Sequence, residues 1–347
     1  MKAQLNAPAM LVLGLVLVAS GCTNTEGSDS ADVSVEQESG VTIQSFETQR
    51  SEVREGDSIR PRMVVKNNGG RAAQNAKALL YNYPSVWSSE DGTNAVLDFG
   101  DIRAPDPDRN RPSPPARDDA TIQVNSDYRQ GQNVPVDVKA VLVYDYDTIA
   151  DTGVIVAPRA LAPEVDSSPE VDNTAGPVQM DVVSEAVISV PEDETQASTQ
   201  VCLEVKNAGD GTPLLPSVYD SGIRSVPLSN INENVNAMRV TAEIRSDIVD
   251  VAGENPKTIR LFDSTATTRC WDLQANVDQN INRQTTERVS FIAEYAYRDK
   301  DSIGLSITGR DGTPDASSSG GSGSGASIPS PPSGDSDVVE PNVDTPE

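Results

Sequence analysis

The chain has 347 residues, with 53 Asp and Glu against 27 Lys and Arg, a formal charge of −26, and no histidine. The missing histidine excludes Ser-His-Asp and Cys-His catalysis and the usual zinc and haem sites. The acidic balance and an aromatic content of 4% argue against a nucleic-acid groove, which needs basic and stacking side chains.

The charged residues are unevenly chosen, with 33 Asp, 20 Glu, 20 Arg and only 7 Lys. Compact carboxylates, with arginine in place of lysine, indicate a halophilic surface, because a Debye length of about 3 Å at about 1 M salt screens self-repulsion. The alternative is an ordinary acidic exported protein whose charge lies partly in its tails.

Residues 1–21 predict a signal peptide, because Lys2 precedes an apolar run, Ala7 to Ala19, that is shorter than the about 20 residues of a membrane-spanning helix. The segment resembles a lipoprotein signal peptide with the lipobox Ala19-Ser20-Gly21-Cys22. That resemblance implies cleavage before Cys22 and a lipid on its sulfur. The lipid would anchor the protein to the outer face of the cell membrane. The alternative is a plain secretory signal.

Two polar segments flank the remainder of the chain. Residues 22–40 contain almost no apolar residue, so we expect a disordered tether. Residues 311–347 consist mainly of Ser, Gly, Pro and Asp and predict a disordered tail. The tail either crosses a wall layer, carries O-linked glycans, or has no partner.

The region between these tails predicts an all-β fold of two domains, 41–160 and 177–310, joined by a polar linker, 161–176. Short alternating runs of Val, Ile, Thr, Tyr and Leu are separated by Gly, Pro, Asn and Asp, which is typical of a β-sandwich. The halves also resemble each other. The clearest matches are Met63 to Gly69 with Leu203 to Gly209, and Tyr144-Asp145-Tyr146 with Tyr295-Ala296-Tyr297.

Each copy contains one long alternating strand that ends in tyrosines. Apolar residues recur at every second position from Val138 to Tyr146 and from Val289 to Tyr297. We expect these tyrosines to pack in the core with their hydroxyls hydrogen-bonded at its edge. We also expect each strand to open a final hairpin.

The order of these motifs resembles the CARDB-type immunoglobulin-like domains of archaeal and bacterial cell surfaces. The residues that carry the resemblance are Val65, Lys66, Asn67, Gly69, Phe99, Gly100, Tyr144 and Tyr146. It implies two tandem immunoglobulin-like β-sandwiches with a surface adhesion or scaffolding role. It transfers no catalytic residues.

Two cysteines remain when Cys22 is set aside, and thiols of an exported chain are expected to pair. By the repeat, Cys202 lies on the second strand and Cys270 on the fifth, which are neighbours in an immunoglobulin-type sheet. A Cys202–Cys270 disulfide would then lie on the outer face, with Leu203 and Trp271 inside. Two buried free thiols are the alternative. The corresponding positions of the first copy are expected to be Arg62 and Thr121.

Three aspartates, Asp145, Asp147 and Asp151, form a weak candidate calcium site. Spaced around the expected hairpin, they would bring three hard oxygen ligands together. The simpler interpretation is a solvated acidic turn.

A second candidate site is the loop from Arg103 to Asp118, which is longer than its counterpart and contains five prolines. It presents Arg103, Arg109, Arg111 and Arg117 among carboxylates. Arginine binds carboxylate or sulfate groups bidentately, and a stiff loop loses little entropy on binding. The sequence therefore suggests an envelope polysaccharide or glycoprotein as partner, although a tolerated surface insertion is the alternative.

The leading functional hypothesis is a lipid-anchored, non-catalytic binding, adhesion or envelope-scaffolding protein. The alternative is an accessory subunit of a membrane transporter or envelope-assembly machine. We expect no enzyme activity, because acidic pairs such as Asp118-Asp119 have no recognisable cleft around them. We also expect no cofactor, and the acidic balance argues against a nucleic-acid partner.

Overall fold

The structure is a computed structural model that describes residues 33–84, 87–89, 95–125, 128, 131–162, 169–216, 235–262, 265–277 and 283–309. Cys22, residues 1–21 and the tail 311–347 lie outside these residues. Strands dominate the described part of the chain, whose one short helix is the 3₁₀ turn η1 (Pro107–Arg109). No helix in this part is long and apolar enough to cross a membrane.

The largest element is a ten-stranded sheet with the central order β18-β16-β20-β10-β5-β7. These strands are β18 (Lys257–Arg260), β16 (Ala237–Ile244), β20 (Thr285–Thr308), β10 (Asn133–Pro158), β5 (Ala73–Tyr81) and β7 (Val96–Ile102). Four short strands complete the sheet: β2 (Glu52–Arg54), β11 (Val171–Asn173), β13 (Val187–Val190) and β15 (Thr212–Leu214). Strands from both predicted domains therefore share one sheet.

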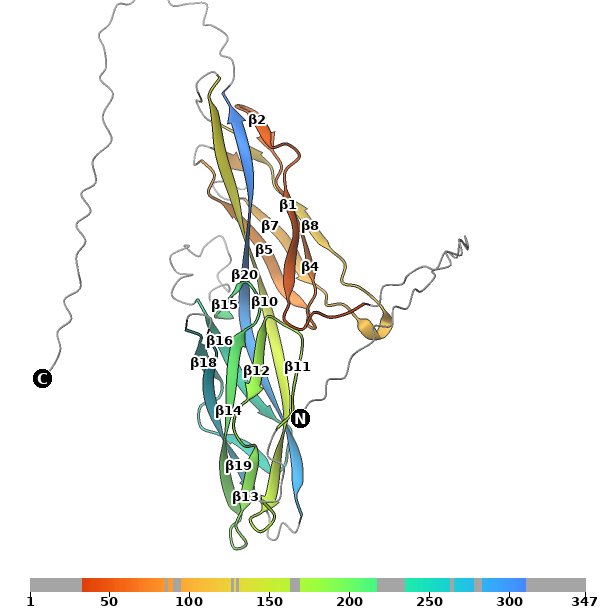
Figure 1. Cartoon of the computed structure of the whole chain (residues 1–347), viewed down its shortest axis with the longest axis vertical. Coiled ribbons are helices and arrows are strands. Elements are labelled where there is room, and N and C mark those ends of the chain that lie inside the picture. Colours follow the sequence, from red (N-terminus) through yellow and green to blue (C-terminus); the bar gives the residue numbers. More distant parts are fainter. Residues whose placement is uncertain are drawn as a thin grey trace, which may run out of the picture.

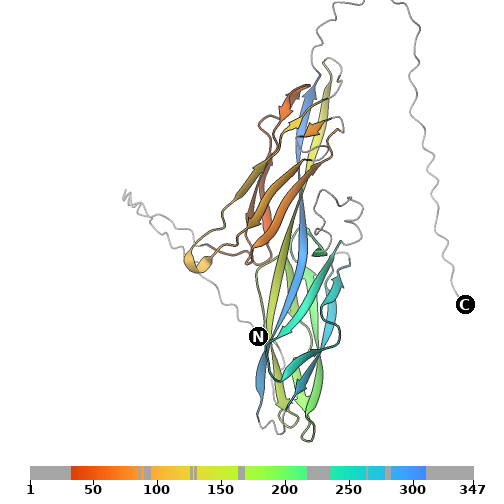
Figure 2. The same ribbon diagram turned by 180° about the vertical axis from the view of Figure 1, so that it is seen from behind.

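Strands β10 and β20 form the axis of the molecule. They pair antiparallel along the 24 residues of β20, and Figures 1 and 2 show them running the length of the elongated fold. At about 3.3 Å per residue, this ladder is about 80 Å long. The N-terminal part of β10 pairs with β5, whereas the N-terminal part of β20 pairs with β16.

The central pairing is symmetric about Asp145 and Ala296. Tyr144 lies opposite Tyr297, and Tyr146 lies opposite Tyr295. The repeat relates Tyr144 to Tyr295 and Tyr146 to Tyr297, so exchanging the copies preserves the register. The duplicated sequence thus folds with an approximate twofold relationship inside one chain.

Two smaller sheets are paired separately from the large one. One has the order β1-β4-β8, with strands β1 (Val41–Glu47), β4 (Arg62–Asn67) and β8 (Ala116–Asp119). The other has the order β12-β14-β19-β17, with strands β12 (Val178–Val182), β14 (Gln196–Asn207), β19 (Thr267–Asn276) and β17 (Val249–Ala252). A third small sheet is formed by β3 (Ser58–Ile59), β9 (Ile122–Gln123) and β6 (Ser88–Ser89). These layers give the sandwich character that the alternating pattern predicted.

One hydrophobic cluster extends through both halves. It includes Met63 and Leu142 from the first half, and Trp271 and Phe291 from the second. Every second residue of β10 from Val138 to Val156 is buried, so this strand contributes to the core on both sides of the centre.

The expected hairpins after the tyrosine strands are wrong. β10 continues through Asp147 and Asp151 to Pro158, because the alternation of buried and less buried residues continues without a turn. Gly153 stays within the strand, where a Cβ atom would lie 2.9 Å from the Thr286 methyl group of β20. The boundary at 161–176 remains a prediction, although β10 and β20 connect the two predicted units.

Candidate functional site

A polar groove lies on the outer face of the β1-β4-β8 sheet. Strand β4 alternates, with Met63, Val65 and Asn67 buried while Arg62 is exposed. In register, Arg62 lies between Glu47 of β1 and Asp119 of β8. The strand period of two therefore places one arginine between two carboxylates on the solvent side.

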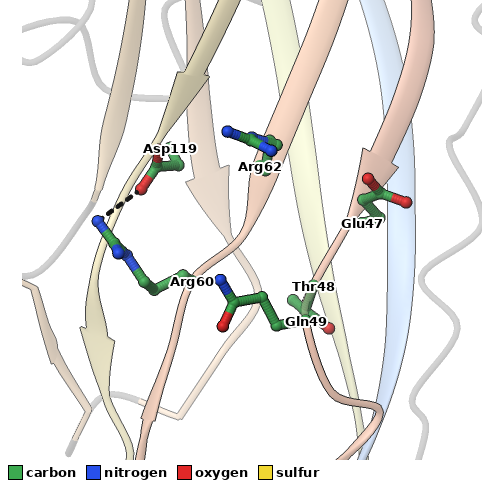
Figure 3. Close-up of a pocket in the computed structure, with 6 residues that line it drawn as sticks. All are labelled: Glu47, Thr48, Gln49, Arg60, Arg62 and Asp119. Carbon is green, nitrogen blue, oxygen red and sulfur yellow. Dashed lines mark ion pairs between the residues drawn. The ribbon is translucent and has the colours of Figure 1, made fainter.

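The groove is lined by Glu47, Thr48, Gln49, Arg60, Arg62 and Asp119, and its volume is about 340 Å³ (Figure 3). A second hollow of about 270 Å³ shares Thr48, Gln49 and Arg60, and its other lining residues are Arg50, Val53, Asp57, Ser58 and Ile59. The shared residues make the two hollows contiguous, so together they form an extended and mostly polar depression.

The two central arginines, Arg60 and Arg62, differ in whether they form an ion pair. Arg60 forms an ion pair with Asp119 at 3.1 Å, with 57% of the arginine side chain exposed. Among the described residues, Arg62 makes no ion pair within 4.0 Å. The exposed Arg60–Asp119 pair contributes little stability. The guanidinium of Arg62 points into the groove beside it (Figure 3).

The corresponding place in the second copy holds a disulfide. Cys202 lies opposite Cys270 in the β14–β19 register, and their sulfurs are bonded. Leu203 and Trp271 are fully buried, so the predicted outer-face bridge is confirmed. The register of the first copy pairs Arg62 with Asp119, so Asp119, rather than Thr121, corresponds to Cys270.

The proline-rich loop carries three of the four predicted arginines away from this groove. Arg103, Arg109 and Arg111 are exposed, and Arg109 lies 3.7 Å from Asp106. The loop is tied at its base, because the buried Ser113 hydroxyl donates to the Arg103 carbonyl at 2.8 Å. Figure 1 shows η1 projecting from the body of the fold.

The fourth predicted arginine, Arg117, lies on β8 and shares the outer face of the small sheet. It is opposite Val64, one alternation away from the Arg62–Asp119 pair. The structure therefore separates Arg117 from the other three and places it nearest the groove.

The three candidate calcium ligands are distributed along one strand. Asp147 pairs with Arg71 at 2.7 Å, Asp151 pairs with Arg288, and Asp145 accepts a hydrogen bond from Asn75. In a strand, alternate residues on one face are about 6.6 Å apart, so these carboxylates do not converge. No group of three potential ligands is found in the described part of the chain.

The Asp151 carboxylate is nonetheless stabilised in its charged form. Its hydrogen bond from Arg288 is the main cause of a lowered pKa, and a hydrogen bond from Ser290 adds to the effect. This arrangement is a cross-strand ion pair between β10 and β20.

Four buried tyrosines occupy the centre of the molecule, as the sequence predicted. The Tyr144 hydroxyl accepts a hydrogen bond from Val41 N, and the Tyr146 hydroxyl donates one to Ala175 O, both at 3.0 Å. The Tyr295 hydroxyl shares a hydrogen bond with Thr148 Oγ1 at 2.8 Å, and the Tyr297 hydroxyl donates to Asn207 Oδ1 at 3.0 Å. Burial raises the pKa of each, to about 12 for Tyr146. Neutral, bonded phenols of this kind support packing.

The shared Asn-x-Gly motif lies against two of these tyrosines, Tyr146 and Tyr297. The Asn67 side chain donates to the Arg71 carbonyl at 2.7 Å, and Asn207 donates to the Gly211 carbonyl at 2.9 Å. A Cβ at Gly69 would lie 2.2 Å from the Tyr146 hydroxyl oxygen, so this close approach requires glycine.

Arg60 and Arg62 were missed as candidate site residues. The available signal was Arg60-Pro61-Arg62 immediately before the motif strand, on an otherwise acidic chain. Only the register with β1 and β8 shows which carboxylates lie beside them.

No protein-family model and no curated protein matches the chain. Among solved structures, a Salmonella α2-macroglobulin mutant is 9% identical, with a TM-score of 0.17, and the match covers 79% of this chain and 16% of that one. Red sea bream transglutaminase is 11% identical, with a TM-score of 0.16, over 78% of this chain and 31% of that one. The Staphylococcus aureus collagen adhesin is 10% identical, with a TM-score of 0.12, and the match covers 80% of this chain and 94% of that one.

The matched segments thus span less than a third of the macroglobulin and the transglutaminase. TM-scores this low say nothing about the function of the chain.

Proposed function

We propose that this chain is an exported, non-catalytic binding and scaffolding protein held at the outer face of the cell membrane by a lipid on Cys22. The observation that carries the proposal is the uninterrupted β10–β20 ladder. A ladder of about 80 Å that enters both halves of the core resists bending between them. Such a body suits a spacer that presents a binding face at a distance from the membrane.

Two further features fit this proposal. The Cys202–Cys270 disulfide is of the kind that persists in oxidising compartments. The strongly acidic, lysine-poor composition suits a surface exposed to concentrated salt.

The test is cell fractionation in molar salt, comparing the natural chain with Cys22→Ser. The natural chain should partition with membranes, be cleaved by protease added to intact cells, and show a lipid adduct on Cys22 by intact mass. Cys22→Ser should be released or remain as precursor. An unmodified Cys22 thiol in the mature protein would refute anchoring, and protection from external protease would refute the surface location.

A further inference from the structure

We propose that the groove between Glu47, Arg62 and Asp119 binds an acidic saccharide, meaning a sugar chain that carries carboxylate or sulfate groups. This inference deepens the proposed surface function and rests on it. It assigns the binding to the outer face of β1-β4-β8, not to the projecting loop that holds Arg103, Arg109 and Arg111.

The first argument is the supply of guanidinium groups. Arg50, Arg60 and Arg62 line the two contiguous hollows of a protein that carries a formal charge of −26. The fork of N–H donors on a guanidinium matches the paired oxygens of a carboxylate or sulfate. Arg62 is the central candidate, since it makes no ion pair among the described residues and its guanidinium points into the groove.

The second argument is that the lining suits hydroxyl groups as well as anions. Glu47 and Asp119 offer acceptors, whereas Thr48 and Gln49 offer both donors and acceptors. The six residues of the first hollow include no hydrophobic residue, so a lipid chain or an aromatic ring would find little apolar surface there. A simple inorganic anion would leave the two carboxylates unused and repelling it.

The third argument comes from the second copy of the fold. The repeat and the strand registers relate Arg60, Arg62 and Asp119 to Gln200, Cys202 and Cys270, which carry no charge. In the second copy, the Cys202–Cys270 disulfide occupies the positions that Arg62 and Asp119 hold in the first. The charged groove is therefore not required by the fold, because the corresponding strands β12, β14 and β19 pair without it.

Direct contacts are also suited to a salt-rich environment. At about 1 M salt, attraction between charges beyond about 3 Å is screened, so recognition depends on short hydrogen-bonded contacts. Bidentate guanidinium contacts are short and directional, and they retain specificity when long-range attraction is lost.

The experiment measures retention of the natural chain on immobilised polygalacturonate, dextran sulfate and neutral dextran, in molar salt. Arg62→Gln and Arg60→Gln/Arg62→Gln test the groove. Arg239→Gln, at an exposed position of β16, is the matched control because it removes the same charge from the other half. Asp119→Asn removes the ion-pair partner of Arg60. Circular dichroism verifies the fold of each variant.

We expect retention on at least one acidic polymer and none on neutral dextran. Arg62→Gln should weaken binding about tenfold, equivalent to about 1.4 kcal/mol, the double variant should weaken it more, and Arg239→Gln should leave it unchanged. Asp119→Asn should strengthen it, because this change frees Arg60 and removes a repelling charge, while the amide oxygen still accepts hydrogen bonds. Preference for polygalacturonate identifies carboxylate recognition, and preference for dextran sulfate identifies sulfate recognition.

Three results would overturn the proposal: no retention on either acidic polymer, equal retention on neutral dextran, or equal losses in Arg62→Gln and Arg239→Gln. None of these would affect the fractionation test of Cys22, so failure of the groove is distinguishable from failure of the surface assignment.

Discussion

Tyr144 and Tyr297 lie opposite each other at the centre of the β10–β20 ladder, with their ring centroids 5.8 Å apart. Each belongs to a different copy of the repeat. Their neighbours Tyr146 and Tyr295 form the related pair at 6.1 Å. The contact between the copies is therefore built from the same residues that define the motif within each copy. This arrangement couples the stability of the two halves.

We predict that stability falls steeply in alkaline solution. The four buried tyrosines have raised pKa values, so the folded state keeps them protonated while the unfolded chain releases protons near the ordinary pKa of 10. The stabilisation is complete below pH 10 and is lost as pH rises through the folded pKa values. Each tyrosine contributes a slope of about 1.4 kcal/mol per pH unit above pH 10.

Urea unfolding at pH 8, 10 and 11, at constant salt, measures this slope. Tyr297→Phe should reduce it by about a quarter, since one of the four phenols no longer titrates. A free energy of unfolding that is unchanged between pH 8 and pH 11 would contradict the role of these phenols.

Breaking the disulfide should destabilise the whole molecule. The bridge joins residues separated by 68 positions, for which chain entropy gives about 4 kcal/mol, a model-dependent value. Because β10 and β20 enter both halves of one hydrophobic cluster, we expect the Cys202→Ser/Cys270→Ser variant to unfold in a single transition at lower temperature. Calorimetry checks this expectation. Two transitions, with only one shifted, would instead indicate halves that unfold independently.

Asn67→Ala should cost about 2 to 3 kcal/mol. The buried Asn67 amide donates to the carbonyls of Arg71 and Ile102, and its oxygen accepts from Gly69 N at 3.0 Å. Removing the side chain leaves buried backbone groups without partners. The matched control is Asn68→Ala, whose side chain bonds only to exposed or partly buried groups. Equal losses of unfolding free energy in the two variants would argue against this role.

Asp151→Asn should reduce stability at neutral pH but have less effect in acid. The hydrogen bond from Arg288 lowers the Asp151 pKa, so its stabilising effect is present above the ordinary aspartate pKa and is lost as pH falls through the folded value. Denaturant unfolding at pH 7 and pH 3 compares the two conditions. A difference between the natural chain and the variant that is as large at pH 3 as at pH 7 would count against this ion pair.

The local patterns of the sequence were sufficient for several features of the fold. The alternation of apolar residues predicted strands and their buried faces, because side-chain direction in a strand depends only on the period of two. The repeat of Val-Lys-Asn-x-Gly placed Cys202 on the second strand of its copy. The expectation that Cys270 lies on a neighbouring strand is confirmed by the disulfide.

Other features required the tertiary structure. Asp147 and Asp151 have the composition of a turn, but an uninterrupted buried face and a 24-residue partner strand hold them within β10. Whether a tyrosine strand turns back or continues is decided by long-range pairing with β20, whose energy is absent from any short window of sequence. The groove likewise exists only in the register that brings Glu47 and Asp119 to either side of Arg62. Sequence alone determined which residues face inward, and the pairing of distant strands decided which of the outward residues became neighbours.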